Sequence, residues 1–469
     1  MSIEFSKSLT TTTTPIPGVV LYQLPVHGDN RGWFKENWQR EKMMALGLPD
    51  FFPVQNNISF NAKAGTTRGI HAEPWDKFIS VASGRIFGAW VDLREGDSFG
   101  AVFTTVMDPS HAIFIPRGVG NAFQTLEDST AYTYLVNDHW SADAQDQYTF
   151  LNLADEKAAI DWPIPLDQAE LSLKDESHPR LSKVEPMMPK KILVLGADGQ
   201  LGKALREAYH DNTSVEFATR SDFDLGAQAS YTRRKWKNYS TVINAAAYTA
   251  VDAAETAEGR KTAWAINVTA VARLAAVCAN HGITLVHVSS DYVFDGSQEW
   301  HAEDEELTPL GVYGQTKAAG EAVVAVIPRH YIVRTSWVIG EGKNFVRTMA
   351  SLARQGIAPT VVNDQIGRLS FAQDIAAGIL HLLQTGADFG VYNLTNTGEP
   401  QSWADIAADI YELSGASRDH VTGVSTQVYF EGKPAAPRPM NSVLDLSRIK
   451  ATGFIPAHSQ QRLTEYLAK

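Results

Sequence analysis

Two side chains in the stretch TTRGIHAEPWDK are suited to chemistry on a carbon acid. His71 precedes Lys77 by six residues. An imidazole with a pKa of ~6.5 can take a proton from carbon beside a ketone, and an ammonium can stabilise the enolate oxygen that results. If the chain between them is extended, the even separation places both on one face of a sheet, although Pro74 leaves that register open.

His71 has two other interpretations, a packed core histidine or a metal ligand. A His-x-His metal site also needs a glutamate and another histidine, and this stretch offers only His71 and Glu73. Asn121 stands in IPRGVGNAF, where the further histidine would be expected. A divalent metal would lack ligands, and the single cysteine, Cys278, excludes a multi-cysteine cluster. We therefore expect no bound metal.

Two arginines in the same half could hold an anion. Arg31 in GDNRGWF and Arg68 in TTRGIH each offer a guanidinium for bidentate pairing with a diphosphate. The formal net charge of −12 argues against broad nucleic-acid binding, which requires a basic face. An anionic ligand must therefore be held by a few placed arginines or backbone amides.

A second chemical pair lies in VYGQTKAAGE, where Tyr313 and Lys317 are four residues apart and share one face of a helix. An ammonium near a phenol favours the phenolate and lowers the tyrosine pKa from ~10 toward neutrality, so that the tyrosine can exchange a proton with a carbonyl oxygen. Ser290 in SSDYVFDG ends a predicted parallel strand and can hold that oxygen. A lone Tyr-xxx-Lys is usually a surface helix pair, but the strand-end serine in the correct order favours catalysis.

Three glycines in GADGQLG, Gly196, Gly199 and Gly202, follow an apolar strand and open a helix. Glycines there let the backbone approach a pyrophosphate beside the positive end of the helix dipole. The spacing differs from GxGxxG, so the pattern alone only weakly indicates a dinucleotide. Arg220, after the next strand, could bind a 2′-phosphate and favour NADPH, or could be a solvated loop residue.

These residues require two different scaffolds. From about Gly18 to Leu153 the chain reads as short strands separated by turn residues, which predicts an antiparallel sandwich, barrel or jelly roll. After Lys190 the pattern becomes strand, turn and helix, which predicts a parallel, doubly wound sheet. The Pro- and charge-rich stretch between them, DWPIPLDQAELSLKDESHPRLSKVEPMMP, reads as a domain exit and linker. The predicted domains are residues 1–185, including that linker, and residues 190–469.

Length and composition agree with this division. A chain of 469 residues suggests two or three domains at ~100–200 residues each. Hydrophobic residues make up 44% of the chain and charged residues 20%, which is typical of a soluble globular protein. The sequence contains no run of ~18 apolar residues that could span a membrane. The N-terminus has no apolar segment typical of a secretory signal, and one cysteine fits a reducing compartment. We expect a cytoplasmic protein, in which the threonines at 10–14 form a solvated strand or loop.

One helix in the second half has a marked apolar face. In KTAWAINVTAVARLAAVCANHG, apolar side chains recur at helical spacing, and Gly282 can end the helix. The predicted stripe consists of Trp264, Val268, Val271, Leu274 and Cys278.

The second half resembles the extended short-chain dehydrogenase/reductase family and, within it, the dTDP-4-dehydrorhamnose reductases. The resemblance covers nearly all of residues 190–469 and rests on GADGQLG, VINAAAYTAVDAAE, WAINV, SSDYVFDG, VYGQTKAAGE, IVRTSWVIG, NDQIGR and RPMNSVLD. It implies that Tyr313 donates a proton, that Lys317 binds the nicotinamide ribose and tunes the tyrosine, and that Ser290 takes a position more often held by threonine.

The same resemblance implies a Rossmann-type fold that binds NADPH or NADH. The implied cofactor-binding residues are Gly196, Gly199, Gln200, Leu201, Gly202, Arg220, Asp224, Ala245, Ala246, Ala247, Tyr313 and Lys317. Arg438 in APRPMNS could grip a substrate diphosphate or be a surface loop arginine.

The first half resembles the dTDP-4-dehydrorhamnose 3,5-epimerases, which have a jelly-roll (cupin-like) fold. The resemblance spans about residues 18–175 and rests on DNRGWFKE, QNNIS, GTTRGIH, DKFISVASGRIFGAWVDLR, FIPRGVGNAF and LSLKD. It implies that His71 is the base, Asp175 its carboxylate partner and Lys77 the enolate stabiliser, in a homodimer. The implied substrate-binding residues are Arg31, Glu36, Gln55, Asn57, Arg68, Asn121, Tyr134 and Trp140.

One departure from this family concerns the acid on the opposite face of the sugar. Alignment of YTYLVNDHW places Trp140 where these epimerases have a tyrosine, and an indole cannot deliver a proton at neutral pH. His139, Tyr132, Tyr134 or a water could serve instead, or only one carbon is inverted.

Because the product of one resembled family is the substrate of the other, the two halves support a single interpretation. We expect a bifunctional enzyme that makes dTDP-L-rhamnose from dTDP-4-dehydro-6-deoxy-D-glucose. A reductase fused to a single-carbon epimerase, or to an inactive domain that binds the nucleotide sugar, is one alternative. A non-catalytic, reductase-like regulatory subunit is another, although the intact Tyr313 and Lys317 argue against it.

Overall fold

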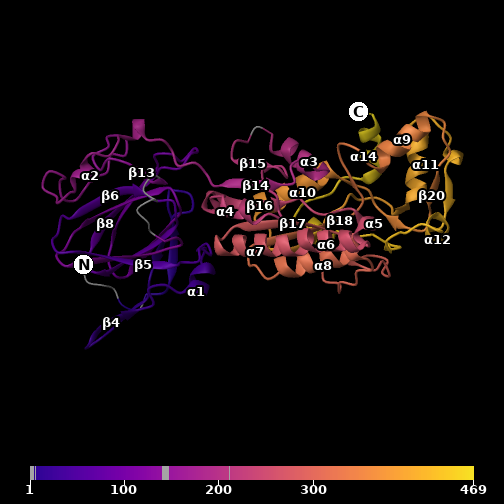
Figure 1. Ribbon diagram of the computed structural model, residues 1–469. Helices are drawn as coiled ribbons and strands as arrows, with labels where there is room; N and C mark the ends of the chain where they lie inside the picture. The colour runs from indigo at the N-terminus through magenta and orange to yellow at the C-terminus, as the bar shows by residue number, and fades with distance from the viewer. Residues whose placement is uncertain (1–4, 6, 140–146, 211, 469) are drawn as a thin grey trace. The chain divides into compact units, whose positions relative to one another are not determined.

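The chain divides into two units, Met1–Pro189 and Lys190–Lys469, coloured from indigo to magenta and from magenta to yellow in Figure 1. The structure is a computed structural model that describes residues 5, 7–139, 147–210 and 212–468.

Unit 1 is built from two antiparallel sheets. The first has the order β1 (Thr10–Thr13), β2 (Val20–Gln23), β10 (His111–Ile115), β7 (Lys77–Ser83), β12 (Thr130–Val136) and β5 (Gln55–Asn61). The second has the order β13 (Thr149–Phe150), β6 (Thr67–Ala72), β11 (Val119–Thr125), β8 (Ile86–Asp92) and β9 (Val102–Met107). Inward side chains of both sheets, among them Ile79 and Trp90, form one buried cluster. The predicted antiparallel sandwich is confirmed by these pairings.

The stretch FISVASGRIFGAWVDL illustrates how the sandwich forms. A turn at Gly84, which has a φ of +78°, separates β7 from β8. The two strands then join different sheets, so residues close in sequence come to face each other across the sandwich.

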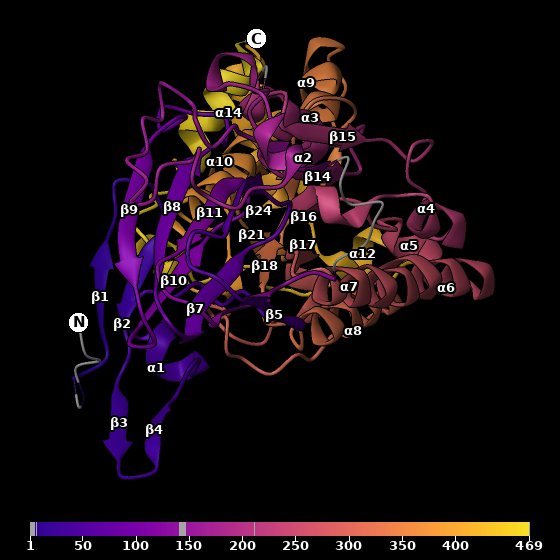
Figure 2. The same ribbon diagram turned by 90° about the vertical axis from the view of Figure 1, so that its left-hand side faces the viewer.

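Three features flank the sheets of unit 1. The threonine run forms the exposed strand β1, as predicted. The strands β3 (Val26–Asp29) and β4 (Gly32–Lys35) pair with each other in a hairpin that extends away from the sheets in Figure 2. The helix α1 (Arg40–Met44) follows the hairpin and buries Met43.

The segment predicted as a linker is instead an integral part of unit 1. Thr66 pairs with Glu170 and Arg94 pairs with Met187 in isolated β-bridges. Trp162 lies in a buried cluster with residues of the second sheet. The short helix α2 (Leu173–Glu176) therefore packs on the sandwich, because apolar residues of this Pro-rich stretch find a surface to cover.

Unit 2 has a six-stranded parallel sheet. Its order is β15 (Val215–Ala218), β14 (Lys191–Leu195), β16 (Tyr239–Asn244), β17 (Thr284–Ser290), β18 (His330–Thr335) and β23 (Gly390–Asn393). The helices α3 (Gln200–Tyr209) and α10 (Ala372–Thr385) share one buried cluster with the sheet. The helices α7 (Val271–Asn280) and α8 (Val312–Val324) contribute to a second cluster on the other face. The predicted doubly wound parallel sheet is confirmed.

The C-terminal part of unit 2 forms a further hydrophobic cluster. It includes residues of α9 (Phe345–Arg354), α11 (Trp403–Leu413) and α14 (Ser459–Leu467). The short elements of unit 2 are α4 (Gln228–Thr232), α5 (Val251–Ala254), α12 (Thr426–Tyr429), α13 (Ser447–Ala451), β19 (Val338–Ile339), β20 (Thr360–Val362), β21 (Ile366–Gly367), β22 (Ser370–Phe371), β24 (Gln401–Ser402) and β25 (Thr422–Val424).

The helix with the marked apolar face corrects one prediction. The segment runs as α6 (Ala257–Trp264), a π-helical stretch (Ala265–Ala270) and α7, which ends at Asn280, and Gly282 follows it with a φ of +61°. Val271, Leu274 and Cys278 are buried as predicted, but Trp264 is 41% exposed. A π turn contains one more residue than an α turn, so it rotates the preceding residues out of the stripe. By length and composition alone, the helix Ala257–Asn280 could cross a membrane. Buried core helices often have the same length and composition, so this is weak evidence for a membrane span.

Candidate active sites

A pocket of about 690 Å³ lies in unit 1 and brings the predicted base and cation together. His71 reaches it from β6 and Lys77 from β7, which belong to different sheets. The two residues therefore do not share one face of a sheet, which is the arrangement that an extended chain between them would have produced. The chain turns between the two residues, and they approach the pocket from opposite walls.

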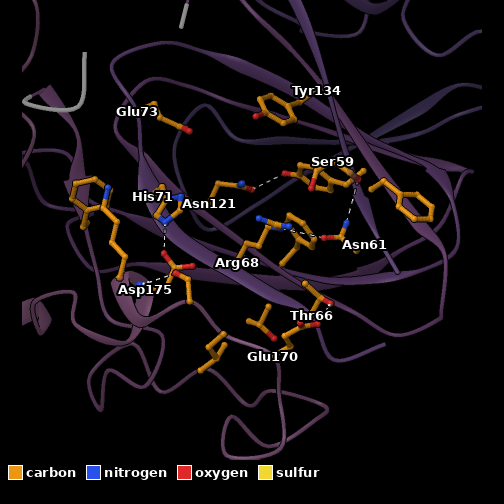
Figure 3. Close-up of a pocket in the computed structure, with 18 of the residues that line it drawn as sticks. Ser59, Asn61, Thr66, Arg68, His71, Glu73, Asn121, Tyr134, Glu170 and Asp175 are labelled. Carbon is orange, nitrogen blue, oxygen red and sulfur yellow. Dashed lines mark hydrogen bonds and ion pairs between the residues drawn. The ribbon is translucent and has the colours of Figure 1, made fainter. Parts of the chain in front are cut away.

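His71 and Asp175 form a hydrogen-bonded pair at the edge of this pocket, shown in Figure 3. The distance from His71 Nε2 to Asp175 Oδ1 is 2.8 Å. Asp175 lies on α2, where Ser172 caps the helix by accepting a hydrogen bond from the Asp175 N–H. Burial alone would raise the pKa of Asp175, but hydrogen bonding to His71 and the charge of His71 outweigh it and lower this pKa.

Lys77 is buried, with a side chain 5% exposed, and contacts the carboxylate of Glu73. Burial lowers the pKa of Lys77 to about 7. Its Nζ lies 5.3 Å from the centre of the Tyr134 ring, on β12. The Lys77 ammonium thus has the Glu73 carboxylate and the Tyr134 ring as neighbours, and it reaches the pocket from the sheet opposite that of His71.

Three of the predicted substrate-binding residues also line the pocket: Arg68, Asn121 and Tyr134. Arg68 donates from Nε to Asn61 Oδ1 at 3.1 Å (Figure 3). Asn121 is paired in register with His71, and its Oδ1 accepts from Trp90 Nε1 and from the Tyr132 hydroxyl. The asparagine at the expected metal-ligand position is therefore bound into the sandwich core.

Four predicted substrate-binding residues are not among the residues of this chain that line the pocket. They are Arg31, Glu36, Gln55 and Asn57. Arg31 lies in the β3–β4 hairpin with a side chain 85% exposed and pairs with Asp29. Glu36 pairs with Lys42, and Gln55 donates to Asn57 at 2.7 Å on the edge strand β5. Trp140 lies outside the described residues.

Reasoning from the sequence missed several residues at this site. Tyr148, Glu170 and Lys174 line the pocket, and burial raises the pKa of Tyr148 to about 12. His178 is buried behind His71, with ring centres 5.4 Å apart. Burial, followed by the charge of His71, lowers the pKa of His178. Its position three residues after Asp175 is the available signal in the sequence, but the composition of this stretch predicts a linker.

The second site lies at the carboxyl end of β17, which carries Ser290 and against which α8 packs with Tyr313 and Lys317. Ser290 is the last residue of β17, and its hydroxyl donates to Asp291 Oδ1 at 2.9 Å. Tyr313 and Lys317 lie in the first turns of α8, and both are buried. Lys317 Nζ donates to the Val288 carbonyl at 2.7 Å, which anchors α8 to β17.

The expected effect of Lys317 on Tyr313 is corrected by the structure. Burial raises the pKa of Tyr313 to about 12, although a hydrogen bond with Ser290 opposes this rise. Burial also lowers the pKa of Lys317 to about 8. The cost of burying a phenolate outweighs the hydrogen bond with Ser290, so the phenol keeps its proton and is suited to donate it.

The glycine turn has the shape that a dinucleotide requires. Gly196 has a φ of +79°, and a Cβ there would meet Ala246 N at 2.9 Å. A Cβ at Gly202 would come within 2.2 Å of the Gly196 carbonyl oxygen. Only glycine fits these positions, so the backbone stays open at the N-terminus of α3 and the residues present fit a nicotinamide dinucleotide.

The other predicted cofactor-binding residues surround this turn. Gln200 Oε1 accepts a hydrogen bond from Gly340 N at 2.7 Å. The Leu201 side chain lies in the core, so only the backbone amide of Leu201 remains to contact a cofactor. Arg220, 86% exposed, lies near Asp224 after β15. Ala245, Ala246 and Ala247 follow β16 at the same end of the sheet.

Arg438 is anchored rather than free on a surface loop. Its NH2 group donates to both carboxylate oxygens of Asp252 at 2.7 and 2.8 Å, and its side chain is 15% exposed. The Phe430 ring lies 4.7 Å from the guanidinium. The guanidinium is therefore held in one orientation.

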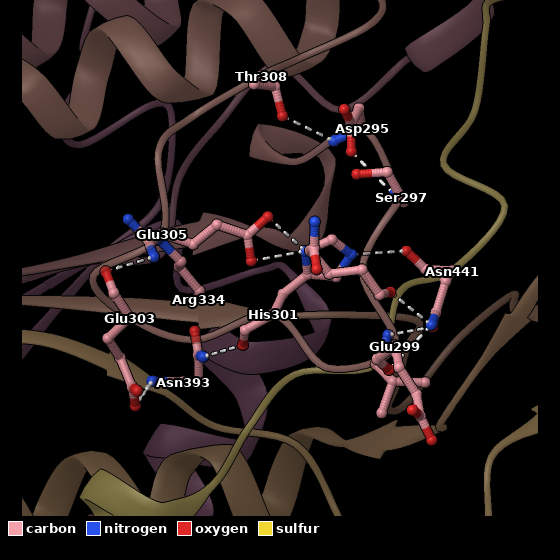
Figure 4. Close-up of polar contacts among 12 residues, drawn as sticks. Asp295, Ser297, Glu299, His301, Glu303, Glu305, Thr308, Arg334, Asn393 and Asn441 are labelled. Carbon is pink, nitrogen blue, oxygen red and sulfur yellow. Dashed lines mark hydrogen bonds and ion pairs between the residues drawn. The ribbon is translucent and has the colours of Figure 1, made fainter.

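A polar network shown in Figure 4 fixes the loops around this site. His301, fully buried, contacts Glu305 at 2.9 Å and the Asn441 carbonyl at 3.2 Å. Asn441 in turn donates to the Glu299 carbonyl at 2.9 Å. The loop after β17 is thus joined to the segment that carries Arg438.

Comparison with known proteins agrees with both sites. The model of the RmlD substrate binding domain family matches residues 190–469, and that of dTDP-4-dehydrorhamnose 3,5-epimerase matches residues 13–183. The RmlC homolog of Streptococcus pyogenes serotype M6 is 52% identical over 182 residues, which cover 38% of this chain and 91% of the relative. The dTDP-4-dehydrorhamnose reductase of Aggregatibacter actinomycetemcomitans is 36% identical over 288 residues, which cover 58% of this chain and 97% of the relative.

A solved structure supports the cofactor. The crystal structure of the Bacillus anthracis dTDP-4-dehydrorhamnose reductase in complex with NADP is 31% identical, with a TM-score of 0.55, over 60% of this chain and 99% of that one. Fold and sites thus define an isomerase joined to an NAD(P)H-dependent oxidoreductase. The chain belongs to the dTDP-4-dehydrorhamnose 3,5-epimerase family through its first unit and to the dTDP-4-dehydrorhamnose reductase family through its second. It is a bifunctional enzyme of dTDP-rhamnose biosynthesis.

Proposed function

We propose that unit 1 inverts C3 and C5 of dTDP-4-dehydro-6-deoxy-D-glucose and that unit 2 reduces the C4 ketone of the product. The observation that carries this proposal is the arrangement of the unit 1 pocket. A histidine–carboxylate pair lies on one wall, and a buried lysine beside a tyrosine lies on the other. Removal of a proton from carbon beside a ketone needs a base and a donor for the enolate oxygen, and these groups can supply both without a covalent intermediate.

In unit 1, His71 is the base. With Nε2–H donated to Asp175, Nδ1 carries the lone pair that takes a proton from C3 or C5, both adjacent to the C4 ketone. The Asp175 carboxylate stabilises the imidazolium that forms. Lys77 donates to the enolate oxygen.

Tyr134 is the acid that returns a proton from the opposite face. It lies on β12 in the sheet across from His71, and burial raises its pKa while Arg68 lowers it. A phenol that keeps its proton can deliver it to carbon, so Tyr134 supplies the function that the Trp140 position lacks. Arg68 holds the sugar nucleotide from the floor of the same pocket.

In unit 2, a nicotinamide cofactor bound at the glycine turn would supply the hydride for C4. Tyr313 gives its proton to the ketone oxygen, and Ser290 donates a hydrogen bond to the same oxygen. Lys317 holds the nicotinamide ribose near Tyr313. Arg438 binds the substrate diphosphate.

We also propose a homodimer formed through unit 1, in the cytoplasm. The strand β5 lies at the edge of its sheet, with Ile58 70% and Phe60 64% exposed. Exposed apolar residues on an unpaired edge favour pairing with another chain. Light scattering of the wild type and of Ile58→Asp tests this proposal, because a monomeric wild type would contradict it.

The deciding experiment omits the reduced cofactor and incubates the protein with the 4-keto sugar nucleotide in D2O. Deuterium at both C3 and C5 supports the double epimerase, and deuterium at one carbon supports the single-carbon alternative. No deuterium would overturn the assignment of unit 1. Oxidation of NADPH after its addition then tests unit 2, and its absence would favour the regulatory alternative.

A further inference from the structure

His178 is a buried histidine that the proposed reactions do not use. It stacks on Phe150 with ring centres 4.6 Å apart and meets His71 edge-on at 5.4 Å. Among the residues that the structure describes, neither ring nitrogen of His178 has a partner at full hydrogen-bond geometry, and the polar groups that act on the ring are the Leu151 backbone and the Asp175 carboxylate. Burying an imidazole whose ring nitrogens are so poorly hydrogen-bonded is costly, and a ligand at those nitrogens would offset the cost.

The neighbours of His178 are the two members of the catalytic pair. Its Nε2 lies 4.0 Å from Asp175 Oδ1, and His71 Nε2 lies 2.8 Å from the same oxygen. One donor atom from each of His71, Asp175 and His178 lies within 4.8 Å of the others. A tetrahedral zinc ion with bonds of about 2.0–2.2 Å needs donors about 3.3–3.6 Å apart, so no two donors would have to approach by more than about 1.5 Å to form the site.

We propose that His71, Asp175 and His178 bind Zn²⁺ and that bound zinc inhibits the epimerase. Two imidazoles and a carboxylate are ligands that favour zinc over magnesium or calcium. This site differs from the His-x-His arrangement that the sequence argued against, because Asp175 and His178 come from the C-terminal segment of unit 1. The inhibitory effect rests on the proposed role of His71 as the base.

Zinc at this position would remove both components of the base. The metal would take His71 Nε2 and the Asp175 carboxylate, so Asp175 could no longer stabilise an imidazolium. Its positive charge would also disfavour a proton on Nδ1 of the same ring. His178 does not line the pocket, so the metal would bind behind the sugar and leave the nucleotide-binding residues accessible. Inhibition should therefore lower kcat and leave KM nearly unchanged.

The first test counts zinc on untagged, metal-free protein by competition with a chromogenic chelator. We expect His178→Phe, which keeps the stacked ring, and His178→Gln each to lose one zinc equivalent per chain. The matched control His111→Gln removes a histidine of unit 1 that pairs with Asp108, away from this site, and should keep that equivalent. Equal zinc binding by the wild type and both folded His178 variants would overturn the proposal. Zinc anomalous scattering should also place the ion about 2.0–2.2 Å from all three donors.

The second test measures deuterium exchange into the sugar with and without one equivalent of zinc. Zinc should abolish exchange in the wild type, a chelator should restore it, and the His178 variants should resist zinc. Reduction of supplied dTDP-4-dehydro-L-rhamnose by unit 2 is the internal control and should not change. Undiminished exchange in zinc-saturated wild type would contradict inhibition. A metal-free wild type without exchange would instead refute the proposed function, and the zinc count would still decide whether the site exists.

Discussion

Asp175 Oδ1 accepts a hydrogen bond from His71 Nε2 at 2.8 Å, although 104 positions separate the two residues. The contact exists because the Pro-rich C-terminal segment of unit 1 returns over β6 and places α2 beside His71. A segment whose composition suggests a linker therefore supplies half of the proposed catalytic pair. It also supplies His178.

Asp175→Asn should slow deuterium exchange into the nucleotide sugar by about 10²-fold or more, because a neutral amide cannot stabilise the imidazolium. The measurement is mass spectrometry of the sugar nucleotide after incubation in D2O without reduced cofactor. Reduction of supplied dTDP-4-dehydro-L-rhamnose, which occurs in unit 2, should stay at the wild-type rate. An exchange rate close to that of the wild type would show that His71 works without its carboxylate.

The epimerase should lose activity as pH rises through about 7, the pKa to which burial lowers Lys77. Below that pH the ammonium can stabilise the enolate, and above it the neutral amine cannot. Lys77→Arg should remove this alkaline loss, although with a lower maximal rate, because a guanidinium stays protonated. The pH dependence of the deuterium exchange rate distinguishes the two profiles.

Unfolding does not explain that loss, because the contribution of Lys77 to stability has the opposite sign. Its pKa is lower in the folded state than the ordinary 10.5, so the unfolded chain binds more protons between about pH 7 and pH 10.5. This term makes the free energy of unfolding rise with pH across that range. Activity that falls in parallel with stability would contradict the assignment to Lys77.

The parts of the sites that lie within one element were predictable from the sequence. Tyr313 and Lys317 share a helix face because helical spacing requires it, and the glycine turn follows a strand as predicted. The relation of His71 to Lys77 was not predictable in this way. Extended geometry holds only within one strand, and here the chain changes sheets between the two residues.

Two other misses have physical causes. The outward rotation of Trp264 follows from a π turn, which side-chain periodicity does not specify. The pKa of Tyr313 depends on burial, and burial is a property of the folded chain, whereas the sequence shows only the nearby lysine. The contact of Asp175 with His71 was inferred only from the family resemblance, since nothing local joins residues so far apart.

Tyr313→Phe should abolish oxidation of NADPH with dTDP-4-dehydro-L-rhamnose and leave binding of the sugar nucleotide intact, because it removes the proton donor but keeps the ring. The same variant should exchange deuterium in unit 1 at the wild-type rate. His71→Asn is the reciprocal control, with exchange lost and reduction retained. Loss of both activities in either variant would argue against two independent sites.

Glu321→Gln should destabilise unit 2 by about 3–5 kcal/mol, because it leaves the Arg334 guanidinium buried without its carboxylate. The two groups pair at 2.8 Å with side chains 3% and 4% exposed. The double variant Glu321→Leu, Arg334→Met should cost less, since it buries no unpaired charge. Calorimetry of the whole chain measures this change, with the transition of unit 1 as an internal reference. A single variant as stable as the double one would contradict the argument.

Arg220→Ala should raise the KM for NADPH about 10–100-fold and leave the KM for NADH nearly unchanged. Arg220 follows β15 and is 86% exposed, so its guanidinium can reach a 2′-phosphate without breaking a buried contact. Hydrogen bonds to a charged group contribute about 1.5–3 kcal/mol, which corresponds to that change in KM. NADH lacks the phosphate, so it loses nothing when the guanidinium is removed. Arg233→Ala, which changes another exposed arginine of unit 2, is the matched control and should affect neither cofactor. Equal KM values for NADPH in Arg220→Ala and the wild type would make Arg220 a solvated loop residue, and the discrimination between cofactors would then lie elsewhere in the glycine-turn region.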